Sequence, residues 1–260
     1  MRYSICITHY NDDPLTVRRS LDSILCQINQ DFEIIVVDNF SNNGSDRVLQ
    51  DYANKGKIQL YKLKSTRGKA RQYGFERSQG RYILSHFDLD DIFNPILPKL
   101  LEVYHSNFEG MMIKINSTPI QTSCTISPVS LLREIGGWPD TQFFEDYKIW
   151  SEALKMGKYG WINADLLAYG GEHEDRKGLV KYNLYRFQRY RDAYKLGFAL
   201  KPANSGTGRL IRVLAFLSTL PHKNGTRYFF WESEEYRMNA LMPTSDSQSS
   251  SSEQNREQLS

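Results

Sequence analysis

In the first half of the chain, short apolar runs alternate with segments whose apolar residues recur at helical spacing. Residues 3–8 predict a strand, because the run is short and contains β-branched side chains. Asp13 and Pro14 then supply an N-cap and a first-turn proline, and the apolar spacing predicts a helix after them. Residues 32–37 form a near-continuous apolar run, as expected for a strand that is covered on both faces.

The alternation continues with a helix expected at 46–53, a strand at 58–63, a helix at 70–78 and a strand at 81–87. Strands and helices that alternate in this way indicate an α/β fold with a doubly wound, mostly parallel sheet and flanking helices. Ligands of such sheets bind beyond the carboxyl ends of the strands. Functional residues are therefore expected directly after each strand.

The second half of the chain is less regular and is expected to end in a helical extension. The pattern predicts a helix at 145–156, a last strand at 164–169 and further helices at 179–196 and 209–220. We expect an α/β domain at 1–175, with a helical extension packed on or beside it at 176–242. Residues 243–260 are mostly Ser, Gln and Glu, which predicts a disordered tail.

Composition limits the class of protein. The 260 residues include 33 Lys and Arg and 30 Asp and Glu, a mild excess that gives no indication of nucleic-acid binding. The three cysteines are far apart, which predicts reduced thiols and no disulfide or zinc site. Met1 is followed at once by the first predicted strand, and the most apolar stretch, 210–220, is too short to span a bilayer. We therefore expect a cytoplasmic protein without a signal peptide.

Acidic side chains follow the fourth predicted strand. Asp88 and Asp90 are two residues apart, close enough for one or both to bind a hard divalent cation. Mg²⁺ and Mn²⁺ prefer oxygen ligands and are usually held by one or two carboxylates together with substrate phosphates. The alternative is that Asp90 and Asp91 only cap the turn before Pro95, since Asp is common in turns.

Four groups of motifs follow one another between residue 3 and about residue 175. They are Thr8-His9-Tyr10-Asn11; Val36-Val37-Asp38-Asn39 with Ser41 and Gly44; Ala70-Arg71-Gln72 with Gly74, then Asp88-Leu89-Asp90-Asp91 and Pro95; and Gly136-Gly137-Trp138 followed by Glu145-Asp146-Tyr147. In order and spacing they resemble glycosyltransferase family 2. This family has the GT-A fold and includes many enzymes of surface-polysaccharide synthesis and protein glycosylation.

The resemblance implies roles for the matching residues. Asp38 would accept a hydrogen bond from the nucleotide base, with Thr8, Tyr10 and Asn11 in the same pocket, and Arg67, Lys69 and Arg71 would face the phosphates. Asp90 would bind Mn²⁺ or Mg²⁺, Asp88 would contact the metal or the ribose, and His173 would be a further metal ligand. The metal would neutralise the diphosphate leaving group, helped by Arg176 and Lys177. Asp146, or else Glu145, would be the general base that deprotonates the acceptor hydroxyl in an inverting reaction.

The implied partners are a nucleoside diphosphate sugar, with a UDP-sugar as the first expectation, and a saccharide or lipid-linked saccharide acceptor. Other interpretations stay open: Asp146 would equally suit a helix N-terminus without any catalytic role. A nucleotidyltransferase is a second candidate, although residues 8–12 lack the glycine it would need, and a degenerate nucleotide-sugar-binding protein is a third. Asn39 and Gln72 replace an Asp and an Asn of the family pattern, which leaves the nucleotide open.

Residues 182–195 are rich in tyrosine and positive charge. Such a helix either lies on an anionic membrane surface, near a lipid-linked acceptor, or packs its tyrosines on the core with its arginines in water. The first interpretation makes the protein peripheral at the cytoplasmic face of the membrane.

Overall fold

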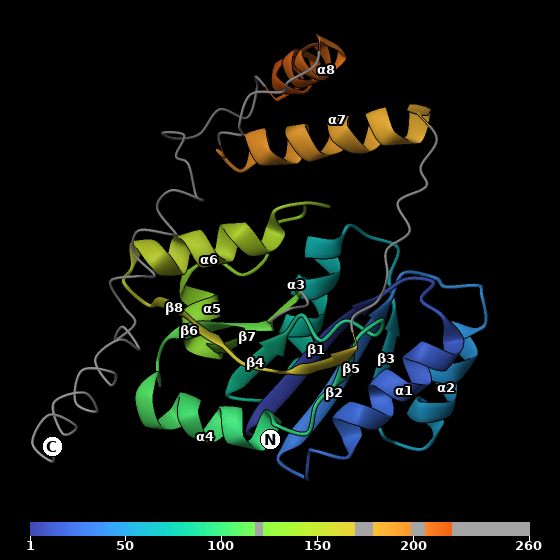
Figure 1. Ribbon diagram of the computed structural model, residues 1–260, viewed down its shortest axis with the longest axis vertical. Helices are drawn as coiled ribbons and strands as arrows, with labels where there is room; N and C mark the ends of the chain where they lie inside the picture. The colour runs from blue at the N-terminus through green and yellow to red at the C-terminus, as the bar shows by residue number, and fades with distance from the viewer. Residues whose placement is uncertain (118–121, 170–178, 199–205, 220–260) are drawn as a thin grey trace, which may run out of the picture.

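A mixed β-sheet with helices on both faces forms the body of the protein (Figure 1). The computed structural model describes residues 1–117, 122–169, 179–198 and 206–219. Within these residues the sheet contains β1 (Tyr3–His9), β2 (Phe32–Asp38), β3 (Gln59–Lys62), β4 (Tyr82–Ser85), β6 (Met112–Ser117), β7 (Thr122–Pro128) and β8 (Tyr159–Asn163). Their order across the sheet is β3-β2-β1-β4-β7-β6-β8. The short strands β5 (Ile92–Phe93) and β9 (Leu167–Tyr169) pair in a separate sheet.

Helices cover both faces of the sheet because successive strand residues point to opposite sides. Ile5 and Ile7 of β1 pack with α1 (Pro14–Leu25), α2 (Ser45–Asn54) and α4 (Leu97–Asn107). Cys6, between them, packs with α3 (Arg67–Arg77), α5 (Val129–Glu134) and α6 (Glu145–Lys155). The strand is thus buried on both sides.

The first four strands in the chain are parallel to one another. Their carboxyl ends therefore lie at one edge, with His9 opposite Asp38 and Cys6 opposite Ser85. This confirms the expected parallel arrangement and the edge where functional residues are sought. On the other side of β4 the sheet is mixed, because β7 is antiparallel to both β4 and β6.

Side-chain caps fix where two of the helices begin. Asp13 directly precedes Pro14, and its carboxylate accepts a hydrogen bond from the Thr16 amide at 2.8 Å. This confirms the predicted start of α1. The Thr66 hydroxyl accepts one from the Lys69 amide at 3.2 Å, so that α3 begins at Arg67, three residues before its predicted start. A Thr or Asp in this position satisfies an amide that has no partner within the helix.

The structure differs from the prediction in the middle of the chain. Residues 92–135 contain α4, β6, β7 and α5, none of which the pattern analysis predicted. The signal in β6 was a short alternation, with Ile113 and Ile115 buried and Lys114 and Asn116 partly exposed. The strand predicted at 164–169 is shortened to β9 and pairs with β5, while β8 takes the edge of the main sheet.

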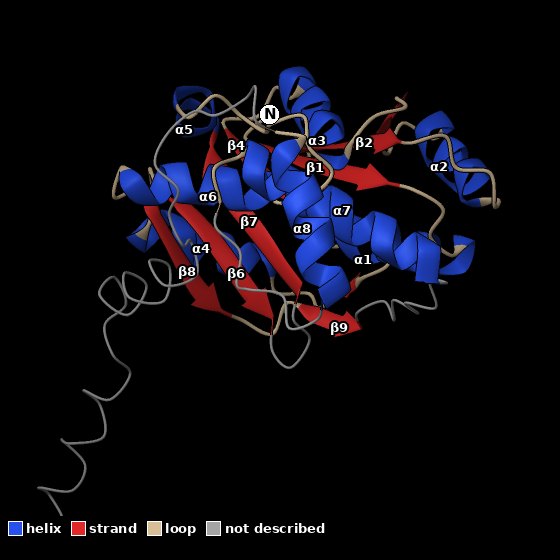
Figure 2. Cartoon of the chain, turned by 90° about the horizontal axis from the view of Figure 1, so that it is seen from above, coloured by secondary structure: helices blue, strands red, loops and turns tan. Residues whose placement is uncertain are grey.

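Two further helices, α7 (Leu179–Lys195) and α8 (Gly206–Leu217), lie at the top of Figure 1 and confirm the predicted helical extension. Seen from above in Figure 2, α8 lies over α7, against which it packs. The Tyr185 ring of α7 contacts Phe143, 4.9 Å between centroids, in the loop before α6. In the described part of the chain, each helix is too short or too polar to cross a bilayer. The tail expected at 243–260 lies outside the described residues.

Candidate active site

A cavity of about 400 Å³ opens at the carboxyl ends of β1, β2 and β4 and at the start of α3. Its position is the one expected for a ligand site in a parallel sheet. The residues that line it are Thr8, His9, Tyr10, Asp12, Val37, Asn39, Ser65, Thr66, Arg67, Ala70, Asp88, Asp90 and Gln142. Of the site residues predicted from the sequence, the cavity brings together Thr8, Tyr10, Arg67, Asp88 and Asp90.

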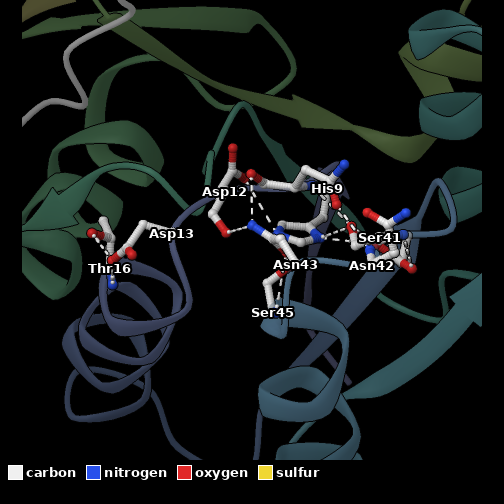
Figure 3. A network of polar contacts seen from close by, with 10 residues as sticks. His9, Asp12, Asp13, Thr16, Ser41, Asn42, Asn43 and Ser45 are labelled. Carbon is white, nitrogen blue, oxygen red and sulfur yellow. Dashed lines mark hydrogen bonds and ion pairs between the residues drawn. The ribbon is translucent and has the colours of Figure 1, made fainter.

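A buried hydrogen-bond network joins the loops that follow β1 and β2 (Figure 3). Asp38 has no exposed surface; one of its oxygens accepts from the Ser41 hydroxyl at 2.5 Å and lies 3.0 Å from His9 Nδ1. Burial alone would raise the pKa of Asp38, but the hydrogen bonds from His9 and Ser41 outweigh it and lower the pKa. Asn11 takes part through its backbone N–H, which donates to Ser41 Oγ at 2.9 Å. Asp38 and Asn11 therefore shape the cavity wall and are not among its lining residues.

Asn39 lines the cavity next to Asp38. Its side-chain oxygen accepts a hydrogen bond from the Ser65 amide at 3.3 Å, at the start of the segment that leads into α3. Because a backbone N–H is always a donor, this contact fixes which end of the Asn39 amide is oxygen. The residue that replaces an Asp of the family pattern is thus the one that faces the ligand space.

Asp88 and Asp90 lie in the segment after β4, and both line the cavity. Among the described residues, no group of three or more His, Cys, Asp and Glu side chains is placed to hold a metal. The two carboxylates nevertheless fit the usual binding of Mg²⁺ or Mn²⁺, in which phosphate and water oxygens complete the ligands. His173, Arg176 and Lys177 lie outside the described residues.

A second polar cluster is built around the first turn of α6. Asp146, whose side chain is 13% exposed, has three donors around the same oxygen, Oδ1. His86 Nε2 lies 2.6 Å from it, Trp138 donates its indole N–H at 3.1 Å, and Arg71 Nε lies 3.3 Å away. Burial would raise the pKa of Asp146, but Arg71 and then His86 outweigh it and hold the pKa far below the ordinary value. Asp146 is therefore an anion at neutral pH.

Glu145, the neighbour of Asp146, has the opposite protonation state. Its side chain is 2% exposed, and Oε1 lies 3.6 Å from Arg71 Nε and 3.7 Å from Arg67 Nε. Burial and the adjacent Asp146 charge raise the pKa of Glu145 to about 8. At neutral pH the pair thus consists of one carboxylate and one carboxylic acid.

The loop that leads into α6 is clamped from two sides. Gly68 of α3 donates its amide to Thr141 O at 3.0 Å, and a Cβ at this glycine would lie 2.0 Å from Pro139 O. From the other side, the Asp192 carboxylate of α7, itself 1% exposed, accepts from the amides of Gln142 at 2.9 Å and Phe143 at 3.3 Å. The clamped loop contributes Gln142 to the cavity wall and turns into α6 at Phe144, with φ of 62°.

The sequence analysis missed several residues of this site. His86, Trp138 and Asp192 contact Asp146 or its loop, and Asn39 and Gln142 line the cavity. Trp138 and Asn39 stand inside recognised motifs, so their positions were available from the sequence. Asp192 lies 46 residues beyond Asp146, where no local pattern links the two. Two predicted phosphate contacts lie elsewhere: Arg71 is buried beside Asp146, and Lys69 is exposed on α3 outside the cavity lining.

Glu145 gives a test of these charges. Between pH 4.5, the ordinary pKa of Glu, and about 8, the folded protein keeps a proton that the unfolded chain releases. Stability should therefore fall as pH rises through this window, by at most about 1.4 kcal/mol per pH unit. We expect Glu145→Gln to lose this part of the slope and to be more stable than the wild type at pH 8, measured by urea unfolding. Glu102→Gln, at an exposed site, should keep the wild-type slope; an unchanged slope in Glu145→Gln would contradict the assignment.

Comparison with known proteins agrees with this fold. Solved structures with the same fold include TarS residues 1–349 of S. aureus with UDP-GlcNAc, at 15% identity, 93% of this chain, 84% of that chain and TM-score 0.60. The mannosyltransferase PcManGT of Pyrobaculum calidifontis, with GDP-Man and Mn²⁺, has 14% identity, 86% and 76% coverage and TM-score 0.58. Glucosyl-3-phosphoglycerate synthase of Mycobacterium tuberculosis, with Mn²⁺, UDP and glucosyl-3-phosphoglycerate, has 14% identity, 71% and 77% coverage and TM-score 0.55.

At these identities the solved structures establish the fold alone. A search of curated protein sequences finds no match. The family model "Glycosyl transferase family 2" matches residues 4–121, which include the ends of β1, β2 and β4 and both Asp88 and Asp90. Over residues 4–121, a little under half of its length, the chain is therefore similar to glycosyltransferase family 2.

Proposed function

We propose that this enzyme is an inverting, metal-assisted glycosyltransferase that uses a nucleoside diphosphate sugar and a hydroxyl acceptor. The main support for the proposal is that the segment after β4 contributes both to the cavity and to the contacts of Asp146. Asp88 and Asp90 line the cavity, while His86, two residues earlier, contacts the Asp146 carboxylate. The segment after β4 thus joins the candidate diphosphate site to the candidate base.

The nucleoside would occupy the part of the cavity formed by Thr8, Tyr10 and Asn39. We assign base contact to Asn39 and a supporting role to Asp38, because Asp38 is buried and already accepts from Ser41. Neighbours of similar fold bind UDP-GlcNAc and GDP-Man, which supports a nucleoside diphosphate sugar as the donor class. A UDP-sugar is the first candidate, and the acceptor is a saccharide or a lipid-linked saccharide.

Asp88 and Asp90 would hold Mn²⁺ or Mg²⁺ against the donor diphosphate. When bound, the metal would supply Lewis-acid neutralisation of the leaving diphosphate. Arg67 lies in the same cavity wall with its side chain half exposed, and its guanidinium is available to the phosphates as a second positive charge. Phosphoryl oxygens and a fixed cation form charge-assisted hydrogen bonds, which are stronger than neutral ones.

Asp146 would accept the acceptor's proton as the hydroxyl oxygen attacks the anomeric carbon and the bond to the diphosphate breaks. The contacts from His86, Trp138 and Arg71 all reach Oδ1, so they hold this oxygen in place. Its low pKa makes it a weak base towards a free hydroxyl. Proton transfer would therefore be late, after bond formation has made the attacking oxygen acidic. Glu145, which is protonated at neutral pH, is not suited to this role.

Metal and donor dependence can be measured together. We expect hydrolysis or transfer from one donor in a panel of UDP-, GDP- and other nucleotide sugars to require Mn²⁺ or Mg²⁺ and to be lost in EDTA. Asp90→Ala should weaken metal-dependent binding of the matching nucleoside diphosphate in calorimetry. Asp31→Ala removes an exposed carboxylate before β2, at the other end of the strand from the cavity, and should behave as wild type. Donor use that is equal with and without metal would contradict the metal role.

Asp146→Asn should abolish transfer and leave donor binding nearly intact. The amide oxygen can still accept from His86 and Trp138, but the side chain cannot take up a proton at neutral pH. Losing a positioned base typically costs about 10²–10⁴-fold in rate. Glu145→Gln is the matched comparison, since it mimics the protonated acid already present, and should retain most of the transfer rate. Single-turnover transfer by both variants tests the assignment, which fails if Glu145→Gln is the variant that loses activity.

Asp192 should act as a positioning residue through its contacts with Gln142 and Phe143. Asp192→Ala removes the acceptor for both amides, and a displaced catalytic group can cost up to about 10²-fold in rate. Asp192→Asn keeps a side-chain oxygen and should recover much of that loss. Hydrogen exchange at amides 142 and 143, measured beside kcat, should follow the same order. Equal losses in both variants with a lowered melting temperature would indicate a purely structural role.

A further inference from the structure

An apolar stripe lies exposed along α8. Four of its side chains are largely exposed: Leu210 by 60%, Val213 by 53%, Leu214 by 49% and Leu217 by 50%. Their spacing of three and four residues places them on one face of the helix. The opposite face packs on α7: Ala215 is fully buried, and the Phe216 ring contacts Tyr194 with 5.6 Å between centroids. We call the four exposed residues the α8 stripe.

Positive charge is concentrated on the same pair of helices. Together, α7 and α8 contain seven Lys and Arg (Lys181, Arg186, Arg189, Arg191, Lys195, Arg209 and Arg212) and a single acid, Asp192. That acid is buried and bonded to the loop before α6. The two helices thus carry a net charge of +6, whereas the whole chain carries +3. The remaining sequence is therefore slightly acidic, and the excess of positive charge belongs to this layer.

The tyrosines of α7 are divided between two environments. Tyr185 packs against Phe143, and Tyr194 is 9% exposed and contacts α8, which supports the core-packing interpretation for these two. Tyr182 is 47% exposed. The continuous apolar face of this layer is consequently on α8, outside the 182–195 segment for which membrane contact was one of two interpretations from the sequence.

We propose that the α8 stripe, with the cations of α7 and α8, docks the enzyme on a bilayer that carries anionic lipid headgroups. An apolar helix face flanked by Lys and Arg is the usual composition of helices that lie in the membrane interface. The apolar side chains enter the boundary between headgroups and acyl chains, and the cations remain at the level of the anionic headgroups. No covalent step is involved.

Charge favours a lipid surface over a second copy of the chain. Two copies joined through the α8 stripe would bring two +6 layers together, and like charges that face each other oppose association. One face of a 12-residue helix is also small beside the roughly 800 Å² per partner of a stable interface. An anionic bilayer attracts the positive charge of this layer. It also does not require a large protein interface, because the apolar side chains enter the lipid.

The position of α7 and α8 determines which part of the candidate active site would face the membrane. In Figure 1, α8 is the outermost element, followed inward by α7, which binds the loop before α6 through Asp192. Docking would therefore hold the start of α6, with Asp146, on the membrane side of the molecule. A lipid-linked acceptor follows from this arrangement only if the proposed role of Asp146 holds. The docking itself needs neither donor nor acceptor.

Flotation of the full chain with lipid vesicles tests the proposal. We expect it to float with vesicles of phosphatidylcholine and phosphatidylglycerol, to stay behind with phosphatidylcholine alone, and to be released in high salt. Replacing Leu210, Val213, Leu214 and Leu217 together by Ser should reduce the bound fraction at least tenfold. The single change Val213→Asp should produce most of this loss at an unchanged melting temperature. Leu15→Ser, at a leucine of α1 that is 65% exposed, is the matched control and should bind as wild type.

Three outcomes would overturn the proposal. They are absence of the chain from anionic vesicles, equal flotation of wild type and Val213→Asp, and a dimer in light scattering that Val213→Asp dissociates without any vesicle binding. The last outcome would assign the α8 stripe to contact between copies. None of them changes the expected transfer by Asp146→Asn and Glu145→Gln with a soluble acceptor, so failure of docking and failure of the proposed chemistry are distinguishable.

Discussion

The buried guanidinium of Arg71 is the interaction on which the site depends. Glu145 and Asp146 are adjacent acids at the start of one helix, and both are taken largely out of water. Two neighbouring buried carboxylates cannot both ionise without compensation. Arg71, 4% exposed, lies 3.3 Å from Asp146 and 3.6 Å from Glu145, and its own pKa is raised by these acids and Asp88 in spite of burial. One cation thus keeps one acid charged and leaves the other protonated.

This arrangement requires close packing between elements that are distant in the sequence. Arg71 belongs to α3, and it reaches α6 only because Gly68, one turn earlier, lets the loop before α6 approach the α3 backbone. A Cβ at Gly68 would meet Pro139 O at 2.0 Å, so even Ala would force the two apart. The cavity shares the same contact, since Arg67 of α3 and Gln142 of the loop both line it. The lining of the cavity and the charge of Asp146 therefore depend on one helix–loop interface.

The sequence predicts the parts of the site that lie next to strands and misses the parts that depend on tertiary contacts. Asp88 and Asp90 follow β4 directly, and the strand-end rule located them. From the sequence, Asp38 was expected to bind the nucleotide base. Strand alternation instead points its side chain inward, where it contacts His9 and Ser41. Its neighbour Asn39 lines the cavity. His86 reaches Asp146 from a left-handed conformation, φ 66°, which no pattern of apolar residues encodes. The unpredicted strands β6 and β7 alternate over a few residues only, too briefly to separate them from loops.

The helix α7 is bound to the α/β domain through the loop before α6. Asp192 places a buried carboxylate on two loop amides, so α7 cannot move away without breaking both hydrogen bonds and leaving the two amides without this acceptor. The cost of such groups, about 1–3 kcal/mol each, is large beside the 0–1 kcal/mol of an exposed ion pair. Force or binding at α8 would therefore reach the loop before Asp146 through one hydrogen-bonded helix. The same contact that positions the candidate base also fixes where the basic, apolar layer lies relative to it.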